Sequence, residues 1–380
     1  RGTGGSLYFI SRQDLLEGSE RMRIEVRDKD SGMVLEVKNL VPLLDYDIDY
    51  LQGRILLVEP LPSSADDGYL VDSGATAGHP VFLVVRYEYT SGLDDLSTMS
   101  VGGQTHYWFN DHVKIGLTTS QEEQAEIENS VLGVDLTLRK SAASWLKIES
   151  GATTGAGVTA NTSLDGGYNF RSDDTFDDTE VDASAFRVEA SIAFQDFFSS
   201  ARGRVTLYHQ NLDAGYSAPG LATDSDTTHY GGTADIPITS RLNTRFKMDK
   251  QEQTEGLETE AMELDVNYAL GERWSVSYGV RQDSRQDNSP VVPDTQEEGD
   301  RTDASVRLSY DSRADWNAYG YLQDTIRTSG NREENDRVGA GGSWRLTDRF
   351  NLVGEASDGN LGMAGLLGTE YLYSDRTTMY

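Results

Sequence analysis

Apolar and polar residues alternate along most of the chain after residue 80. In the clearest run, apolar residues occupy every second position from Met262 to Leu270, and Glu263, Asp265 and Asn267 lie between them. Neighbouring residues of a β-strand point to opposite faces, so this run predicts a strand with one apolar and one charged face. The same alternation recurs at Leu132–Leu138, Phe186–Phe194, Trp274–Val280 and Ala304–Tyr310.

The connections between these runs alternate in length. Short turns, such as 271–273 and 347–349, alternate with longer polar loops, such as 153–180, 213–227 and 284–301. A membrane β-barrel has tight periplasmic turns and longer outer loops, whereas a soluble sandwich has no reason to keep that order. The pattern predicts an all-β fold: an antiparallel transmembrane β-barrel of about 16 or 17 strands or more, each near the roughly 9–11 residues that a tilted strand needs.

Two regions are predicted. Residues 1–78 form a small β-rich module with runs such as Arg21–Arg27 and Arg54–Glu59, which we expect in the periplasm. Residues 79–380 form the barrel region, whose first strand begins at Pro80. The last candidate strand, from Thr377 to Tyr380, is too short to cross a bilayer, so we expect the native barrel to continue. The sequence begins with Arg, and any export signal precedes it.

The composition argues against several classes of function. The formal net charge is −30, which argues against nucleic-acid binding, and the absence of cysteine excludes thiolate metal sites. The long loops are acidic, as at Glu297 and Glu298, and we expect at most weakly bound divalent cations there. We predict no other metal or cofactor. The five histidines form no metal-ligand or nucleophile motif, so no enzyme activity is expected.

Aromatic residues recur beside the short turns. Trp274, Trp316 and Phe350 each follow a charged turn, which is typical of aromatic residues at a membrane interface. Charged residues on the polar strand faces are candidates to line a lumen. They are Arg86, Glu88, Asp135, Arg139, Arg187, Glu189, Glu263, Asp265, Arg281, Asp303, Arg307 and Arg345. Such residues either line a water-filled pore or pair with one another or with a plug and conduct nothing.

The N-terminal residues resemble a known β-module. The stretch Gly4–Glu59, with GGSLYFISRQDLLEGSERMRIEVRDKDSG and LVPLLDYDIDYLQGRILL, is similar to a module of large multidomain Gram-negative outer-membrane proteins. In those proteins a barrel follows directly, as VFLVVRYEY and LTLRKSAASWLKIESG suggest here. The family is largely uncharacterised, so it implies location and architecture and no functional residue. TonB-dependent receptors are a looser comparison, since we recognise no plug domain or energising box.

These observations predict a protein of the Gram-negative outer membrane. We expect a channel or conduit for solutes or a polymer. The alternative is a structural or adhesive surface protein that the barrel anchors and whose acidic loops make contacts. Expected partners are outer-membrane lipid, lipopolysaccharide, and proteins of the periplasm or cell surface.

Overall fold

The computed structural model describes residues 1–73, 78–90, 99–124, 127–155, 161–172, 181–218, 221–290, 292, 296–374 and 377–379. These residues form β-strands and one short 3-10 helix, η1 (Phe194–Asp196). The predicted fold class, an all-β antiparallel barrel region preceded by a small β-rich module, is confirmed.

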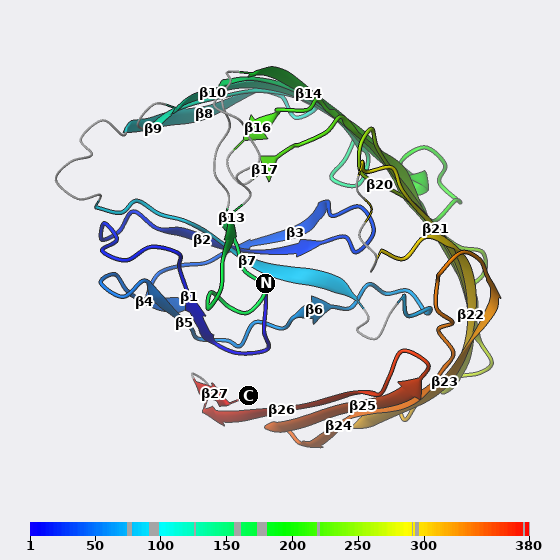
Figure 1. Cartoon of the computed structure of the whole chain (residues 1–380). Coiled ribbons are helices and arrows are strands. Elements are labelled where there is room, and N and C mark those ends of the chain that lie inside the picture. Colours follow the sequence, from blue (N-terminus) through cyan, green and yellow to red (C-terminus); the bar gives the residue numbers. More distant parts are fainter. Residues whose placement is uncertain are drawn as a thin grey trace.

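One antiparallel sheet of 16 strands makes up the larger part of the molecule, and we call it the barrel wall. Each strand pairs with the strands before and after it in this series, from β8 at one edge to β27 at the other. The wall curves in an arc around the N-terminal residues (Figure 1). Its strands are β8 (Met99–Asn110), β9 (Val113–Gln124), β10 (Ile127–Arg139), β11 (Trp145–Gly155), β14 (Val181–Ala193), β15 (Arg204–Leu212), β18 (Thr227–Pro237), β19 (Leu242–Gln253), β20 (Leu257–Ala269), β21 (Trp274–Asp287), β22 (Gly299–Asp311), β23 (Trp316–Thr328), β24 (Arg337–Thr347), β25 (Phe350–Gly359), β26 (Ala364–Ser374) and β27 (Thr377–Met379).

The register keeps like residues on like faces. Leu264 of β20 is opposite Val280 of β21, which is opposite Ala304 of β22. One residue along, Glu263 is opposite Arg281, which is opposite Asp303. Because side chains alternate along every strand, this register gives the wall a continuous apolar face and a continuous charged face. The charged face is the concave one, because its residues contact the module inside the arc.

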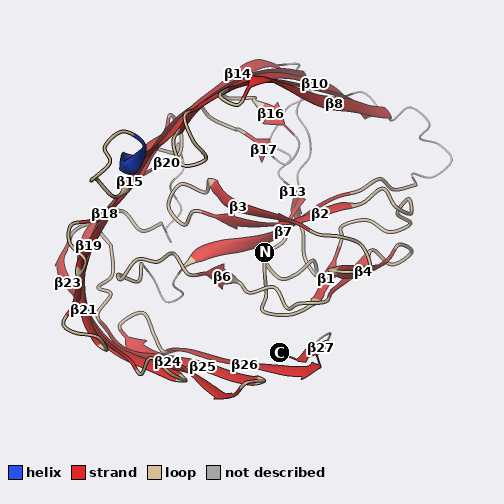
Figure 2. Ribbon diagram, turned by 180° about the vertical axis from the view of Figure 1, so that it is seen from behind, coloured by secondary structure: helices blue, strands red, loops and turns tan. Residues whose placement is uncertain are grey.

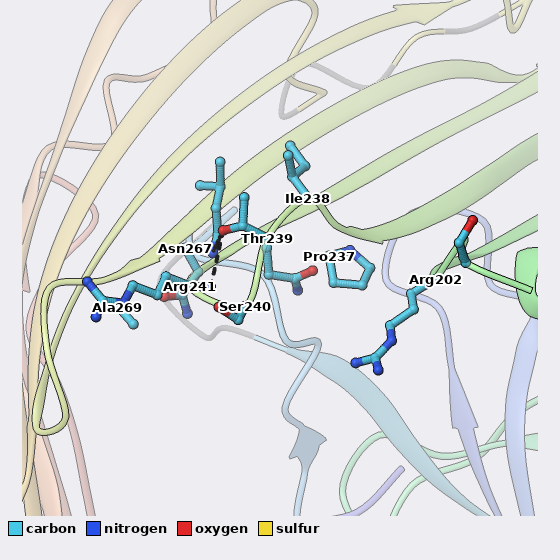
Figure 3. Close-up of a pocket in the computed structure, with 11 residues that line it drawn as sticks. Arg202, Pro237, Ile238, Thr239, Ser240, Arg241, Asn267 and Ala269 are labelled. Atoms are coloured by element: carbon cyan, nitrogen blue, oxygen red, sulfur yellow. Dashed lines mark hydrogen bonds between the residues drawn. The ribbon is translucent and has the colours of Figure 1, made fainter.

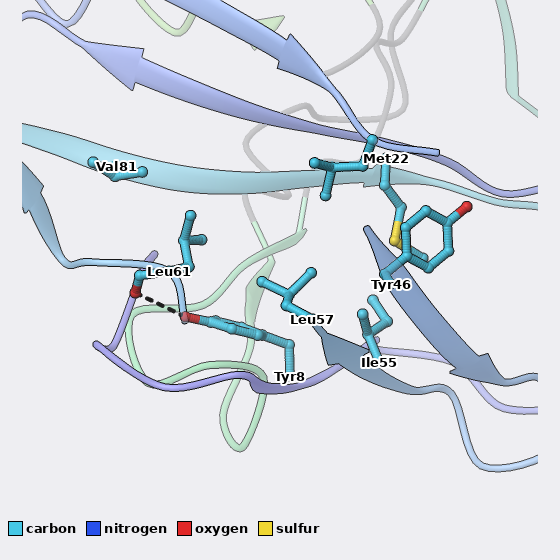
Figure 4. Packing of buried hydrophobic residues seen from close by; sticks show 8 residues of the cluster. Tyr8, Met22, Tyr46, Ile55, Leu57, Leu61 and Val81 are labelled. Atoms are coloured by element: carbon cyan, nitrogen blue, oxygen red, sulfur yellow. Dashed lines mark hydrogen bonds between the residues drawn. The ribbon is translucent and has the colours of Figure 1, made fainter. Parts of the chain in front are cut away.

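The N-terminal module consists of two small sheets. Strands β1 (Leu7–Phe9), β5 (Arg54–Leu57) and β4 (Tyr46–Asp49) form one, in the order β1-β5-β4. Strands β3 (Val34–Asn39), β2 (Arg21–Arg27), β7 (His79–Arg86) and β6 (Ser64–Ala65) form the other, in the order β3-β2-β7-β6. The buried side chains of Tyr8, Met22, Ile55, Leu57 and Val81 belong to one core cluster (Figure 4). Burial of such side chains accounts for the cohesion of the module.

The structure corrects one strand assignment. The run from Pro80 was expected to open the barrel, but β7 pairs with β2 along Val81–Arg86 and with β6 at His79 and Pro80. Because Val81 is buried in the module core, its apolar alternation serves that core and not the wall. Arg86 and Glu88, two predicted lumen residues, therefore belong to the module.

The module was expected in the periplasm and no plug was recognised. In the structure the module lies inside the arc of the wall, and both views show wall strands around it (Figures 1 and 2). Two small hairpins also lie on this side, β12–β13 (Asn161–Thr162 and Arg171–Ser172) and β16–β17 (Ser217–Ala218 and Leu221–Ala222). The periplasmic location of the module stays a prediction.

Candidate functional site: the interface between module and wall

Four adjacent wall strands carry paired charges on their concave face. Each strand places two charged residues two positions apart, so both side chains point inward. These pairs are Lys247 and Asp249 on β19, Glu263 and Asp265 on β20, Arg281 and Asp283 on β21, and Arg301 and Asp303 on β22. All except Asp265 are among the buried residues. Ionised groups are costly to bury unless they are paired, so their partners identify what the surface is built to hold.

A turn of the module faces this surface. After β2 the chain turns through Asp28, Lys29 and Asp30, and Gly32 has a φ of 67°, a conformation that favours glycine. The Oδ1 atom of Asp28 accepts the backbone N–H groups of Asp30 at 2.9 Å and Ser31 at 3.0 Å. The Nδ1 atom of His79 accepts the N–H of Lys29 at 3.1 Å. These bonds fix the turn, so its three charged side chains are presented together.

The charges of the turn complement those of the wall. Lys247 Nζ lies 2.7 Å from Asp28 Oδ2 and 2.8 Å from Asp30 Oδ2. Arg281 Nη2 lies 2.6 Å from Asp30 Oδ1. With the opposite sign, Lys29 Nζ lies 2.9 Å from Glu263 Oε1. Cation meets anion at each contact, so the turn and the wall match in the sign of their charges.

The pKa values of the turn follow from this arrangement. Burial disfavours the ionised form of Asp30, but the opposing charges of Arg281 and Lys247 outweigh it and hold the pKa far below its usual range. Burial also opposes ionisation of Asp28, yet Lys247 lowers its pKa. The pKa of Lys29 is raised, since Glu263 and Asp67 outweigh burial. All three groups are therefore charged at neutral pH.

A second segment of the module follows the wall beyond this turn. In residues 68–73, the backbone bonds to wall side chains. Gly68 O accepts from Arg245 Nη1 at 2.5 Å, and Leu70 N donates to Asp265 Oδ2 at 2.9 Å. Asp72 exchanges two bonds with the Gln323 side chain, at 2.9 and 3.0 Å. The segment acts as a strap that crosses β19, β20 and β23.

The longer loops also reach the module. Phe9 N donates to Gly166 O at 2.9 Å, and the N-terminal amine donates to Ser163 O at 2.6 Å. From the loop after β23, the side chain of Asn335 donates to Asp72 O at 2.6 Å. The module is thus held from the wall and from the loop side together.

The predicted lumen residues divide by environment. Glu263, Asp265, Arg281 and Asp303 lie on the charged surface that faces the module. Other predicted residues pair within the wall: Asp135 with Lys114 at 3.3 Å, Arg187 with Glu189 at 2.5 Å, and Arg307 over the ring of Tyr319. Arg139 and Arg345 lie at the turn ends of their strands, where Arg139 bonds to Asp111 O and Arg345 pairs with Asp315.

Several interface residues were not predicted. Lys247 and Asp249 alternate with Phe246 and Met248, so the period-two signal was present but short. Asp28 and Asp30 gave no strand signal, because they lie in a turn. Their role depends on a contact more than two hundred residues away in the chain, which no local pattern encodes.

Aromatic side chains gather at the short-turn end of the wall. The rings of Trp274 and Tyr310 have centroids 4.8 Å apart, and those of Tyr310 and Trp316 are 4.9 Å apart. Phe350 lies 6.3 Å from Tyr371. The three aromatic residues predicted beside turns therefore belong to ring clusters on neighbouring strands. Their place at a membrane interface stays a prediction.

Three carboxylates in the interface come close enough to suggest a cation site. They belong to Asp28, Asp30 and Asp249. The Nζ atom of Lys247 lies 2.7, 2.8 and 3.1 Å from their oxygens, so its ammonium supplies the positive charge. Weak divalent binding at the acidic loops stays a prediction.

In the described part of the chain, no helix has the length and apolar character needed to cross a membrane. No protein-family model and no curated protein matches the sequence. Among solved structures, the copper transporter OprC is 10% identical, with 82% of this chain and 63% of that chain covered and a TM-score of 0.43. A mutant form of the ferric enterobactin receptor PfeA of Pseudomonas aeruginosa is 12% identical, with 92% and 74% covered and a TM-score of 0.34. The KdgM porin in complex with disordered oligogalacturonate is 10% identical, with 50% and 94% covered and a TM-score of 0.27.

Proposed function

We propose that this chain is a plugged conduit of the Gram-negative outer membrane, in which the N-terminal module closes the bore of the barrel. The observation that supports this proposal most directly is the set of ion pairs between the Asp28–Asp30 turn and the charged surface of the wall. The sequence left open whether the charged residues of the wall line a pore or pair with one another or with a plug. This contact supports pairing with a plug. Passage of a solute or polymer then requires the module to shift.

Exposed apolar side chains on the convex face of the wall support a membrane location. Leu132, Val134, Leu264, Val306 and Leu322 each expose more than two fifths of their surface on the convex side. Monomeric soluble proteins rarely expose apolar patches of this extent, whereas lipid hides them at no cost. Outer-membrane lipid and lipopolysaccharide are therefore the proposed surroundings of the wall.

Because the contact between module and wall is made of charged groups, the module can separate from the wall without exposing apolar surface. If the contact were apolar, movement of the module would expose apolar surface on both sides to water, which is unfavourable. Charged groups on both surfaces can instead be hydrated after separation, although breaking buried pairs is costly. The wall that remains would carry both signs of charge, as water-filled pores do.

Single-channel recording in planar lipid bilayers tests this function. The full chain should be closed for most of the recording time. The double variant D28N/D30N should show discrete openings, because Lys247 and Arg281 lose their module partners. The matched control is E17Q/E36Q, which neutralises two exposed carboxylates of the module that form no ion pair in the described structure.

Silence of D28N/D30N under these conditions would reject the plugged conduit. It would favour the alternative from the sequence, a surface protein that the barrel only anchors. Openings of equal frequency in E17Q/E36Q would show that the Asp28–Asp30 turn has no special part in closure.

A further inference from the structure

His79 lies at the start of β7, next to the turn of the module that contacts the wall. Only 7% of its surface is exposed. Its backbone is fixed on both sides, because Gly78 has a φ of 94° and the following Pro80 restricts His79 to an extended conformation. Here β7 pairs with β6, and His79 is opposite Ala65. The imidazole ring is therefore held in one place beside the turn.

One ring nitrogen of His79 takes part in fixing the turn. Its Nδ1 atom accepts the backbone N–H of Lys29 at 3.1 Å, and a ring nitrogen can accept only when it carries no proton. This hydrogen bond thus requires a neutral imidazole. Protonation of the ring would place an N–H group on Nδ1, so that two donors would face each other across the same distance.

Four charged groups surround the ring. Asp28 and Lys29 belong to the turn, Asp67 directly precedes the strap, and Lys247 belongs to β19 of the wall. The pKa of His79 is lowered, because burial and the two lysines outweigh the two carboxylates. Asp28 Oδ2 lies 3.8 Å from the Nδ1 atom of His79 and 2.7 Å from the Nζ atom of Lys247. A protonated ring would therefore compete with Lys247 for Asp28.

The wall side of the contact is held firmly. Strand β19, which carries Lys247, begins after a tight turn of residues 238–241 that lines a hollow at this end of the wall (Figure 3). Thr239 closes this turn, since its Oγ1 atom accepts the N–H groups of Arg241 at 3.2 Å and Leu242 at 3.0 Å. The strand then pairs with β18 on one side and β20 on the other. Loss of the contact would therefore move the module and not the strand.

We propose that acid releases the module from the wall through protonation of His79. The added proton removes the acceptor that fixes Lys29 and draws Asp28 away from Lys247. The turn then no longer presents its three charged side chains to the wall. This regulation rests on the proposed function, in which movement of the module opens the conduit.

The size of the effect follows from proton linkage. In the released module the ring takes its ordinary pKa of about 6.5, whereas the seated module keeps the ring neutral. Acid therefore favours the released form, which binds the proton more readily. Between pH 7.5 and 5.5, this single group can raise the ratio of released to seated module by up to about tenfold.

Single-channel recording of the full chain in planar lipid bilayers at pH 7.5 and 5.5 tests the proposal. The ratio of open to closed time should rise on acidification, by up to about tenfold more in the parent than in H79Q. The amide oxygen of glutamine can accept the N–H of Lys29 but does not titrate. H79K carries a fixed charge at the same place and should already open at pH 7.5.

The matched control is H112Q. His112 is exposed in the turn between β8 and β9, far along the chain from the module, and H112Q should respond to acid as the parent does. Equal responses of the parent and H79Q would overturn the proposal. So would similar behaviour of H79Q and H79K at both pH values, because a merely structural role of His79 would not distinguish a neutral replacement from a charged one.

Hydrogen–deuterium exchange of the turn separates this inference from the proposed function, because exchange does not require conduction. After correction for the intrinsic effect of pH, a peptide that covers residues 28–33 should lose protection at pH 5.5, and it should lose less in H79Q. Such exchange together with a silent D28N/D30N variant would leave the acid release standing and reject the conduit. Openings of D28N/D30N without an acid response of the parent would leave the conduit standing and reject the acid release.

Discussion

Asp30 lies between two cations of the wall, Lys247 and Arg281, and has little access to water. Its charge is stable there because both cations are within hydrogen-bonding distance. The same residues keep other partners: Lys247 contacts Asp28 and Asp249, and Arg281 contacts Glu263 and Asp283. At the scale of single residues, the interface is thus a network in which each cation serves two or more anions.

Neutralising Asp30 should therefore destabilise the folded protein. We expect D30N to lower the free energy of unfolding by about 3 kcal/mol, at the lower end of the usual range for a broken buried pair, since both cations keep a partner. Urea titration in lipid vesicles measures this. The exposed residue Glu36 provides the control, and E36Q should change the value by less than about 0.5 kcal/mol. Similar losses in the two variants would show that Asp30 is not buried against the wall.

The pH dependence of the interface has two parts. The folded pKa values of Asp28 and Asp30 lie below their unfolded values, so their contribution is complete above about pH 4 and is lost only at lower pH. His79 behaves differently, because burial lowers its pKa. The folded state then binds fewer protons than the unfolded state, so stability falls as pH drops through the unfolded value near about 6.5.

We therefore expect the His79 contribution to the free energy of unfolding to decrease from pH 7.5 to 5.5, and we expect H79Q to lack that contribution and so to lose less stability than the parent over this range. Glutamine is a fitting replacement because its amide oxygen can accept the N–H of Lys29 but does not titrate. Urea titrations at the two pH values provide the measurement. An unchanged slope in H79Q would show that another group is responsible.

At the scale of elements, the strands of the wall separate two environments. In β20, Leu264 is on the convex face with 44% of its surface exposed, while Asn267 is on the concave face. In the proposed location, a single strand thus meets lipid on one side and water on the other. Alternation alone specifies this, because a shift of one residue would exchange every side chain between the faces.

Two arginine substitutions in β20 test the faces. Leu264→Arg should lower the free energy of unfolding in lipid vesicles by about 2–4 kcal/mol, since it places a charge near the middle of the bilayer. Asn267→Arg should cost far less, because the concave face is wet. Equal costs for the two substitutions would contradict the assigned faces.

At the scale of the whole molecule, the module lies inside the arc of the wall and contacts it in several places. The module contacts strands β19 to β23 through the Asp28–Asp30 turn and the strap, and the loop side adds further bonds. In the proposed conduit, movement of the module must break contacts on several strands together. The absence of cysteine makes this testable, because introduced thiols have no competitors.

A disulfide between strap and wall should hold the conduit closed. A Cβ built on Gly279 lies 2.9 Å from the Cβ of Leu70. A disulfide needs about 3.5–4.5 Å, so L70C/G279C requires a shift of about 1 Å. Placed in the D28N/D30N background, the oxidised protein should lose its channel openings, and dithiothreitol should restore them. Openings that persist after complete oxidation would show that conduction does not need the module to move.

The sequence by itself determined the wall and its two faces. Alternation at Met262–Leu270 and Trp274–Val280 was sufficient to predict the two faces, because neighbouring residues of a strand point to opposite sides. The regular exchange of short turns and longer loops was sufficient to predict the wall. It also indicated that Glu263, Asp265, Arg281 and Asp303 share the polar face, since each alternates with an apolar residue.

Only the tertiary structure decided what those charges meet. The strand from His79 to Arg86 has the alternation of a wall strand, yet it belongs to the module. An apolar face gives the same local pattern whether it packs in the core of the module or lies on the convex side of the wall. The contacts of the Asp28–Asp30 turn depend on residues far apart in the chain. Local periodicity does not indicate which distant surface of opposite charge a turn will face, so the contact between module and wall appeared only in the folded molecule.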